Sequence, residues 1–503
     1  MLTENDYLKN ILKAPVYDVA RVTDFQKLKK ISTKTKNLVF IKREDQQIVH
    51  SFKLRGAYNM LYKIKSSNIN GVITASAGNH AQGLALSGKK LNIPVKIVMP
   101  NITPEIKINS VKNLDAEVIL HGVNFDEAQN YALKLSKEQN LKFIPPFDHP
   151  DIITGQGTIG LEIFQQNSHL NYIFIPVGGG GLISGIAILI KQLIPDIKII
   201  AIESEESPCL YEALKTGKPK SLNHVGRFAD GVAVKKIGTE TFRICKDYVD
   251  DIILVNSDEI CSAIKDIFED TRAISEPSGA MGLAGIKKYI SLHNIENKSF
   301  ATILTGANLN FNSLRYISER SEIGEQKEAL FAVKIPEKVG EFLKLYNKLK
   351  GRNITEFNYR FNNSKNANIL IGIRLSSGLD EIKEIQKDLK DACYDAFNLS
   401  NDEIAKQHIK YMIGGKTKEN IEELLFSFEF PEYPGALRIF LNHLIKGTNI
   451  TLFNYRNQGS DYGKVLCGFD VKHTDKKELL NYLKNLNYKF TNVSNNKAFK
   501  VFL

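Results

Sequence analysis

The chain contains 503 residues, of which 24% are charged, and it carries a formal net charge of +11 at pH 7. Single cores seldom grow beyond roughly 250–300 residues, so this length predicts more than one domain. The surplus lysines are dispersed among acidic residues without a basic block, which argues against nucleic-acid binding and is typical of a solvated surface.

Cysteine usage and the first residues favour a cytoplasmic protein. The five cysteines lie far apart without a CxxC spacing, so the sequence predicts neither a metal site nor a disulfide framework. Met1–Asn10 is polar and carries acids, unlike a signal peptide. The uncharged run Tyr172–Ile190 is long enough for a membrane span, but four central glycines favour a buried strand, a loop and a core helix instead.

The first motif in the chain is a lysine at the start of a predicted helix. A strand over Leu38–Lys42 precedes it, and apolar residues from Leu54 to Tyr62 recur at helical spacing, with Ser51 as the predicted N-cap. Lys53 then lies in the first turn, where the helix dipole disfavours an ammonium and lowers its pKa. A neutral amine can attack a carbonyl to form a Schiff base, although an ordinary surface lysine is the alternative.

A second motif joins a strand to a helix through small residues. The strand Gly71–Ala75 runs into Ser76-Ala77-Gly78-Asn79, and a helix is predicted over Ala81–Leu91. Backbone amides exposed at a helix N-terminus bind anions, whereas a tight turn without a ligand is the alternative. Strands and helices continue to alternate beyond this point, which predicts a doubly wound α/β fold around a mostly parallel sheet.

A third motif is the run of four glycines, Gly178 to Gly181. It lies between a predicted strand, Tyr172–Val177, and a helix over Leu182–Leu193. Consecutive glycines let the backbone present several N–H groups to one phosphate. A dinucleotide site would need a third glycine or alanine where Ile183 or Ser184 stands, so a nicotinamide-dependent oxidoreductase is disfavoured.

The last motif of this region places a hydroxyl at the end of a strand. Phe300–Leu304 is followed by Thr305-Gly306-Ala307-Asn308, and side chains at such strand ends face the ligand crevice of parallel sheets. Ser275-Glu276-Pro277 stands just before another predicted helix. A reactive lysine, an anion loop, a phosphate loop and this hydroxyl together suit pyridoxal phosphate, which has one aldehyde, one phosphate and one ring nitrogen.

Five stretches carry a resemblance that extends across the whole chain. The sequence resembles the fold type II pyridoxal-phosphate enzymes and, among them, the biosynthetic threonine dehydratases (threonine ammonia-lyases), through Ser51–Ala57, Ser76–Gly83, Pro176–Gly185, Glu276–Ala280 and Thr305–Phe311.

The resemblance implies a role for each motif. Lys53 would hold the cofactor covalently and move the α-proton of the substrate, and Asn79 would donate to the cofactor's ring oxygen. Thr305 would contact the pyridine nitrogen, where relatives often carry serine, and Glu276 would be a candidate for a supporting polar contact. Backbone amides would bind the cofactor phosphate at Gly178, Gly179, Gly180, Gly181 and Leu182, and the substrate carboxylate at Ser76, Ala77, Gly78 and Asn79.

The implied reaction is the deamination of L-threonine to 2-oxobutanoate and ammonia, the first step of isoleucine biosynthesis. A serine dehydratase or racemase on the same scaffold is the nearest alternative. A non-catalytic amino-acid sensor is a third possibility, which the intact Lys53, Asn79 and glycine loop disfavour.

The last third of the chain is an internal repeat. Phe331 and Phe426 stand in matching motifs 95 positions apart (426 − 331), and Asn-Ile-Thr at 353–355 returns at 449–451. Each copy is predicted to have the β-α-β-β-α-β order of a ferredoxin-like module. The predicted domains are a catalytic domain at 1–320, a linker at 321–328, and two modules at 329–401 and 424–495.

The two modules resemble the ACT-like regulatory domains of the biosynthetic dehydratases. The resemblance implies that isoleucine, opposed by valine, binds near the first strand–helix turn of each copy, at Gly340 and Phe342 and at Gly435 and Leu437. It also implies a homotetramer. A repeat used only for contacts between subunits is the alternative.

Overall fold

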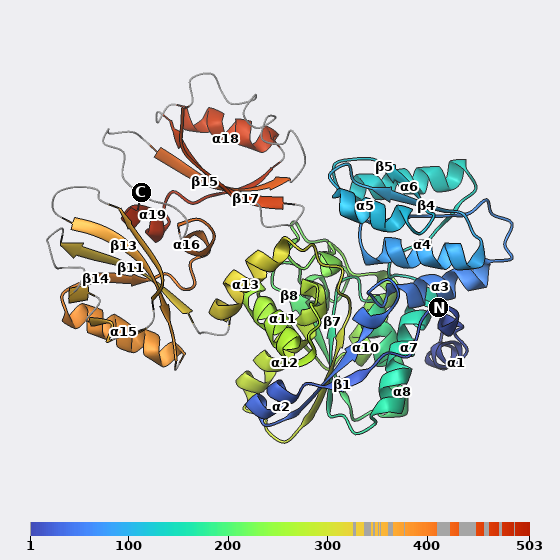
Figure 1. Ribbon diagram of the computed structural model, residues 1–503. Helices are drawn as coiled ribbons and strands as arrows, with labels where there is room; N and C mark the ends of the chain where they lie inside the picture. The colour runs from blue at the N-terminus through green and yellow to red at the C-terminus, as the bar shows by residue number, and fades with distance from the viewer. Residues whose placement is uncertain are drawn as a thin grey trace. The chain divides into compact units, whose positions relative to one another are not determined.

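The computed structural model describes residues 2–324, 328–336, 344–345, 348–350, 352, 354–360, 366–376, 378–409, 423–431, 449–456, 462–471, 475–486 and 488–502. The chain divides into two compact units, Met1–Asn310 and Phe311–Leu503, which are considered one at a time (Figure 1). The domain boundaries drawn from the sequence stay predictions.

Two separate parallel sheets form the first unit. The larger has the order β1-β2-β10-β7-β8-β9, in which only β1 is antiparallel to its neighbour. Its strands are β1 (Phe25–Lys27), β2 (Leu38–Arg43), β7 (Tyr172–Pro176), β8 (Lys198–Ser204), β9 (Asp251–Val255) and β10 (Ser299–Leu304). The smaller has the order β5-β4-β3-β6, with β3 (Val72–Ala75), β4 (Val95–Met99), β5 (Glu117–Leu120) and β6 (Lys142–Phe143).

Helices cover the sheets, as the alternating pattern predicts. Those of the first unit are α1 (Glu4–Leu12), α2 (Lys29–Thr35), α3 (Lys53–Ile64), α4 (Asn79–Leu91), α5 (Glu105–Lys112), α6 (Phe125–Glu138), α7 (Pro150–Gln166), α8 (Gly181–Leu193), α9 (Cys209–Thr216), α10 (Thr239–Tyr248), α11 (Ser257–Thr271) and α12 (Pro277–His293). Helices α4, α5 and α6 lie with the smaller sheet, at the upper right of Figure 1.

The parallel α/β architecture is confirmed, but the sequence suggested one sheet where the structure has two. After β6 the chain crosses to the larger sheet, where β7 pairs with β8 and β10 rather than with β6. Local hydrophobic patterns identify a strand without identifying its partner, so the division could not be predicted from them.

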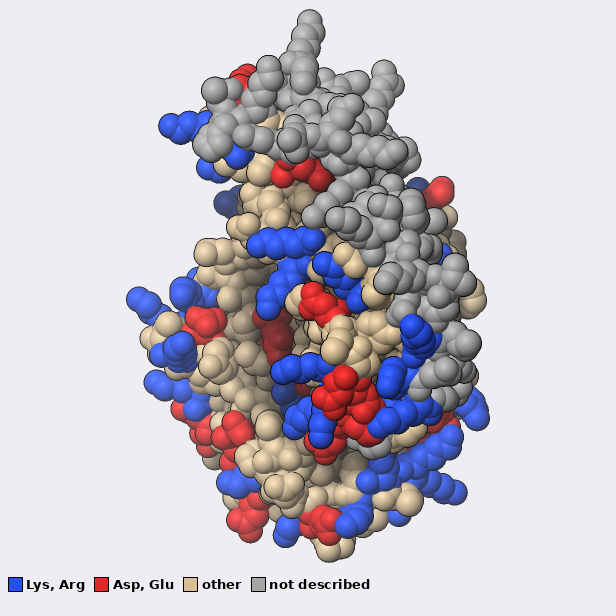
Figure 2. All heavy atoms as spheres, turned by 90° about the vertical axis from the view of Figure 1, so that its left-hand side faces the viewer, with Lys and Arg blue, Asp and Glu red and all other residues tan. Residues whose placement is uncertain are grey.

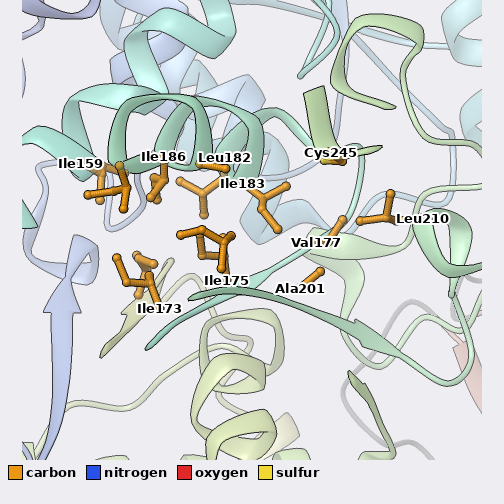
Figure 3. Packing of buried hydrophobic residues seen from close by; sticks show 14 of the residues in the cluster. Ile159, Ile173, Ile175, Val177, Leu182, Ile183, Ile186, Ala201, Leu210 and Cys245 are labelled. Carbon is orange, nitrogen blue, oxygen red and sulfur yellow. The ribbon is translucent and has the colours of Figure 1, made fainter. Parts of the chain in front are cut away.

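The run Tyr172–Ile190 forms a buried strand, a glycine loop and a core helix, as predicted. Ile183 and Ile186 of α8 face Ile173 and Ile175 of β7 within one buried apolar cluster (Figure 3). Among the helices of the described residues, none combines the length and apolar character that crossing a bilayer requires.

Glycines bring three helices of this unit into direct backbone contact. A Cβ on Gly155 of α7 would lie 2.6 Å from the Cα of Gly56 in α3, and a Cβ on Gly185 of α8 would lie 2.6 Å from the nitrogen of Gly157 in α7. Real Cβ atoms do not approach other atoms this closely, so larger residues would push the helices apart. Helix α7 therefore fixes the helix of Lys53 relative to the helix that follows the four glycines.

The second unit contains two antiparallel sheets of the same topology. The first has the order β12-β13-β11-β14 and the second the order β16-β17-β15-β18. Their elements are β11 (Glu328–Pro336), β12 (Ile354–Arg360), β13 (Asn366–Arg374), α15 (Leu379–Asp391) and β14 (Asp395–Asn398), then β15 (Glu423–Pro431), β16 (Asn449–Arg456), β17 (Tyr462–Asp470), α18 (Lys476–Asn485) and β18 (Lys489–Asn492). Three shorter or flanking helices are α13 (Ser313–Gly324), α16 (Glu403–Gln407) and α19 (Lys497–Phe502).

The strand order 4-1-3-2 in both sheets is the ferredoxin-like order that the repeat predicts. The pairing register shifts at the same point of each copy, between Ile354 and Glu356 and between Ile450 and Leu452. A shared irregularity at an offset of 96 residues (450 − 354) supports one module in two copies. Basic and acidic side chains are interspersed on the face of the molecule shown in Figure 2, as the dispersed charge predicts.

Candidate active site

Lys53 is the first residue of α3, so the sequence placed it correctly in the first turn. The prediction that Ser51 caps this helix is wrong. The N-cap residue is Phe52, which makes no side-chain cap, and the Ser51 hydroxyl is buried without a hydrogen-bond partner among the described residues. Ser51 instead forms an antiparallel bridge with Gly306, which holds its backbone away from a capping position.

This bridge ties the start of α3 to the end of β10. The N–H of Phe52 donates to the carbonyl of Thr305 at 3.1 Å, and the N–H of Ala307 donates to the carbonyl of His50 at 2.9 Å. Lys53 and Thr305, 252 positions apart in the sequence (305 − 53), are therefore brought to the same place. Thr305 itself is buried at the end of the strand.

The Lys53 amine has the property that the sequence predicts. Burial lowers its pKa to about 8, against the opposing effect of the Glu276 carboxyl. Its Nζ donates to the carbonyl of Pro146 at 3.3 Å. Desolvation is thus the main reason that the neutral form becomes accessible, in a position where the helix dipole acts in the same direction.

The segment that crosses between the two sheets, residues 144–148, contacts most parts of this site. Pro146 accepts from Lys53, while the ring of Phe147 lies where a Cβ on Gly179 would be. The Asp148 carboxylate accepts from the first N–H groups of α10, at 2.8 Å from the nitrogen of Thr239. The sequence showed only the end of a strand at these residues, because none of these partners is local.

The glycine loop presents donors rather than acceptors. The carbonyl of Gly179 accepts from the Thr241 hydroxyl at 2.7 Å, and the carbonyl of Gly178 accepts from the Cys209 thiol at 3.2 Å. Gly180, with φ of +89°, is the N-cap residue of α8, and this conformation favours glycine. The N–H groups of the first turn of α8 have no acceptor within the helix, so they could bind an anion.

The Ser76-Ala77-Gly78-Asn79 loop ends in a second helix N-terminus. Helix α4 begins at Asn79, two residues earlier than the sequence suggested, with Gly78 as its N-cap. A Cβ on Gly78 would meet nothing within 4 Å, so open space lies beside it. A Cβ on Gly83 would lie 2.8 Å from the nitrogen of Leu54, which means that α4 packs against the first turn of α3, where Lys53 stands.

A hydrogen-bonded chain of polar side chains crosses the site. Asn79 Nδ2 donates to Glu276 Oε1 at 2.8 Å, and the Ser278 hydroxyl donates to the same oxygen at 3.0 Å. Asn308 Nδ2 donates to Asn79 Oδ1 at 2.7 Å. Burial and the charge of Asp230 raise the pKa of Glu276 to about 7, so its carboxyl is easily protonated near neutral pH.

The sequence analysis did not identify His80 as a residue of the site, although the charge of Lys53 acts on its pKa. Burial and then the Lys53 charge lower the pKa of this histidine to about 3, so the imidazole is neutral. Its Nε2 lies 3.4 Å from the carbonyl of Ile144 in the crossing segment. Its place directly after Asn79 was the available signal.

The four predicted effector residues cannot be placed. Gly340, Phe342, Gly435 and Leu437 lie outside the described residues.

The arrangement suits pyridoxal phosphate because each reactive part of that group has a counterpart. The amine of Lys53 could bind its aldehyde, the first turn of α8 its phosphate, and Thr305 its ring nitrogen. The contacts through Phe52, Pro146 and Phe147 bring all three counterparts together.

Two family models match the chain. One, described as pyridoxal-phosphate dependent enzyme, matches residues 16–306. The other, described as C-terminal regulatory domain of threonine dehydratase, matches residues 319–409 and again residues 414–503, one match for each copy of the repeat.

Relatives of known name span the same length. The biosynthetic L-threonine dehydratase IlvA of Escherichia coli (strain K12) is 54% identical over 499 residues, which cover 99% of this chain and 97% of the relative. Among solved structures, the processed form of threonine deaminase isoform 2 from Solanum lycopersicum aligns with a TM-score of 0.62 and 47% identity, over 63% of this chain and 93% of that one. Serine racemase from Dictyostelium discoideum aligns with a TM-score of 0.56 and 33% identity, over 60% of this chain and 99% of that one. The chain therefore belongs to the pyridoxal-phosphate dependent enzymes and, within them, to the family of the biosynthetic threonine dehydratases.

Proposed function

We propose that the protein uses pyridoxal phosphate to deaminate L-threonine to 2-oxobutanoate and ammonia, the first step of isoleucine biosynthesis. The observation that carries the proposal is that the buried, low-pKa amine of Lys53 and the glycine loop both contact the crossing segment, residues 144–148. The full-length similarity to dehydratases supports the proposal as well. We infer a cytoplasmic homotetramer from the same family resemblance.

Each side chain has a proposed task. The N–H groups of Gly178 to Leu182 bind the cofactor phosphate, the Thr305 hydroxyl bonds to the ring nitrogen, and Asn79 donates to the ring oxygen. The amides of the Ser76–Asn79 loop hold the substrate carboxylate, next to the open space beside Gly78. Bound in this way, the cofactor supplies an electron sink for the pair released at the substrate Cα.

Lys53 is the base in this proposal. A pKa of about 8 leaves a usable fraction of neutral amine near neutral pH, and this amine takes the α-proton of threonine. The β-hydroxyl group then leaves as water after it receives a proton. The released enamine tautomerises and is hydrolysed in solution, so threonine yields one 2-oxobutanoate and one ammonia.

Threonine and serine can be separated by turnover. We expect kcat/KM for L-threonine to exceed that for L-serine, with 2-oxobutanoate as the main product, in an assay that measures both keto acids and ammonia. The Dictyostelium serine racemase matches only 60% of this chain, whereas this chain also carries two matches to the threonine dehydratase regulatory-domain model, at residues 319–409 and 414–503. Faster turnover of serine, or D-serine as the main product, would favour the dehydratase or racemase alternative.

The C-terminal modules are proposed to bind isoleucine and to inhibit the reaction, with valine opposing the inhibition. Deleting residues 328–503 is expected to leave an active enzyme whose rate no longer responds to isoleucine, because effector and substrate sites are then uncoupled. The rate would be measured with isoleucine titrated against both forms. Inhibition that persists in the soluble, active truncation would place the effector site in the first unit.

A further inference from the structure

Asn308 follows β10 and bonds to two distant segments through one amide group. Its Nδ2 donates to the carbonyl of Val49 at 2.9 Å and to Oδ1 of Asn79 at 2.7 Å. Val49 precedes the Lys53 helix, and Asn79 begins α4 beside the smaller sheet. Asn308 therefore joins three parts of the site.

The chemistry of the partners fixes the orientation of both amides. A backbone carbonyl only accepts, so the Asn308 atom that faces Val49 is the NH₂ group, whose second hydrogen is directed to Asn79. The Asn79 atom that receives it must be the amide oxygen. Its own NH₂ group then faces Glu276, where it donates at 2.8 Å. The hydrogen-bond partners thus fix which end of the Asn79 amide is the oxygen. The positions of the heavy atoms alone would not distinguish the oxygen from the nitrogen.

We propose that Asn308 is a positioning residue, which holds the oxygen of Asn79 so that the Asn79 NH₂ group faces Glu276 and keeps one N–H for the cofactor. The inference rests on the proposed function, in which Asn79 donates to the cofactor's ring oxygen. A flipped Asn79 amide would present an oxygen to Glu276 and lose its donor. Without Asn308, the Asn79 amide keeps its contact with Glu276, whose carboxyl is easily protonated near neutral pH and can then face either end of that amide.

A double-mutant cycle tests this action through Asn79. The binding of pyridoxal phosphate to the apoenzyme is titrated by absorbance for the native chain, Asn308→Ala, Asn79→Ala and the double variant. We expect each single variant to raise the Kd at least about fivefold and to shift the absorbance maximum, and the double variant to bind no more weakly than Asn79→Ala. Additive losses, or an Asn308→Ala variant with native Kd and spectrum, would overturn the proposal.

The chain offers a matched control at the opposite ends of the same strands. Asn37 is a buried residue whose side-chain amide donates to the carbonyls of Thr35 and Ile295 and accepts from the N–H of Lys298. Asn37→Ala is expected to lower the Tm while it leaves the cofactor Kd and spectrum unchanged. An equal loss of cofactor affinity in Asn37→Ala would assign the Asn308 effect to general destabilisation and overturn the proposal.

A second substitution covers the case in which Asn308→Ala does not fold. Asn308→Asp keeps the shape of the side chain but has no N–H to donate when ionised, so the same loss of affinity and shift of the spectrum are expected. Native behaviour of this variant would contradict the proposal. If the native chain itself does not bind pyridoxal phosphate, the proposed function fails. If the native chain binds it and the Asn308 variants bind it equally well, only the role of Asn308 fails.

Discussion

Lys53→Ala is expected to lower threonine turnover by about 10³-fold or more, because it removes both the covalent anchor of the cofactor and the proposed base. The amine makes one hydrogen bond to Pro146 and has a pKa lowered by burial, so its loss should cost the fold little. Turnover is measured by ammonia release, covalent attachment of the cofactor by mass spectrometry after borohydride reduction, and folding by circular dichroism.

Lys65→Ala is the matched control, since Lys65 lies directly after the same helix and its ammonium stacks on the ring of Tyr62. This variant should keep the activity and the attached cofactor. Turnover retained in a folded Lys53→Ala protein would refute the role assigned to Lys53.

Arg55→Met is expected to cost about 3–5 kcal/mol of unfolding free energy, because it breaks a buried ion-pair network. The Arg55 guanidinium bonds to Glu44 through two contacts of 2.8 Å and to Glu162 at 2.6 Å, and Lys42 also pairs with Glu162 at 2.6 Å. All four side chains are fully buried. Without Arg55, the two buried carboxylates of Glu44 and Glu162 share one remaining ammonium, that of Lys42.

The measurement is urea unfolding of the full chain, followed by circular dichroism. Lys36→Met serves as the control, since Lys36 pairs with Glu296 at the solvent-exposed surface, and such pairs contribute little to the free energy of unfolding. Equal losses of unfolding free energy in the two variants would show that the buried Arg55 network stabilises the protein no more than an exposed ion pair does. Because Arg55 lies two residues after Lys53, we also expect Arg55→Met to lower cofactor affinity.

The sequence identified the motifs of the site because each carries its chemistry locally. Lys53 stands at a helix start, the four glycines open a helix, and Thr305 ends a strand, and all three predictions of placement are confirmed. Their proposed roles toward the cofactor remain predictions. The duplicated module was visible because identical stretches recur at a fixed offset, and its sheet order is confirmed in both copies.

What the sequence could not provide is pairing between distant segments. Asn79 and Glu276 are 197 positions apart and Asn79 and Asn308 are 229 apart, so no pattern in a short window connects them. The wrong capping assignment for Ser51 has the same origin, since the residue pairs with Gly306 from the other end of the unit. Tertiary contacts thus overrode a sound local preference.

The glycine contact between α4 and α3 has a consequence for how the two sheets share the site. Arg55 anchors α3 to Glu44, which follows a strand of the larger sheet, while Ala57, Met60 and Leu61 of α3 join α4 and the smaller sheet in one buried apolar cluster. Helix α3 is therefore attached to both sheets. A larger residue in place of Gly83 would press on the first turn of α3, and we expect it to displace the reactive nitrogen of Lys53 together with α4.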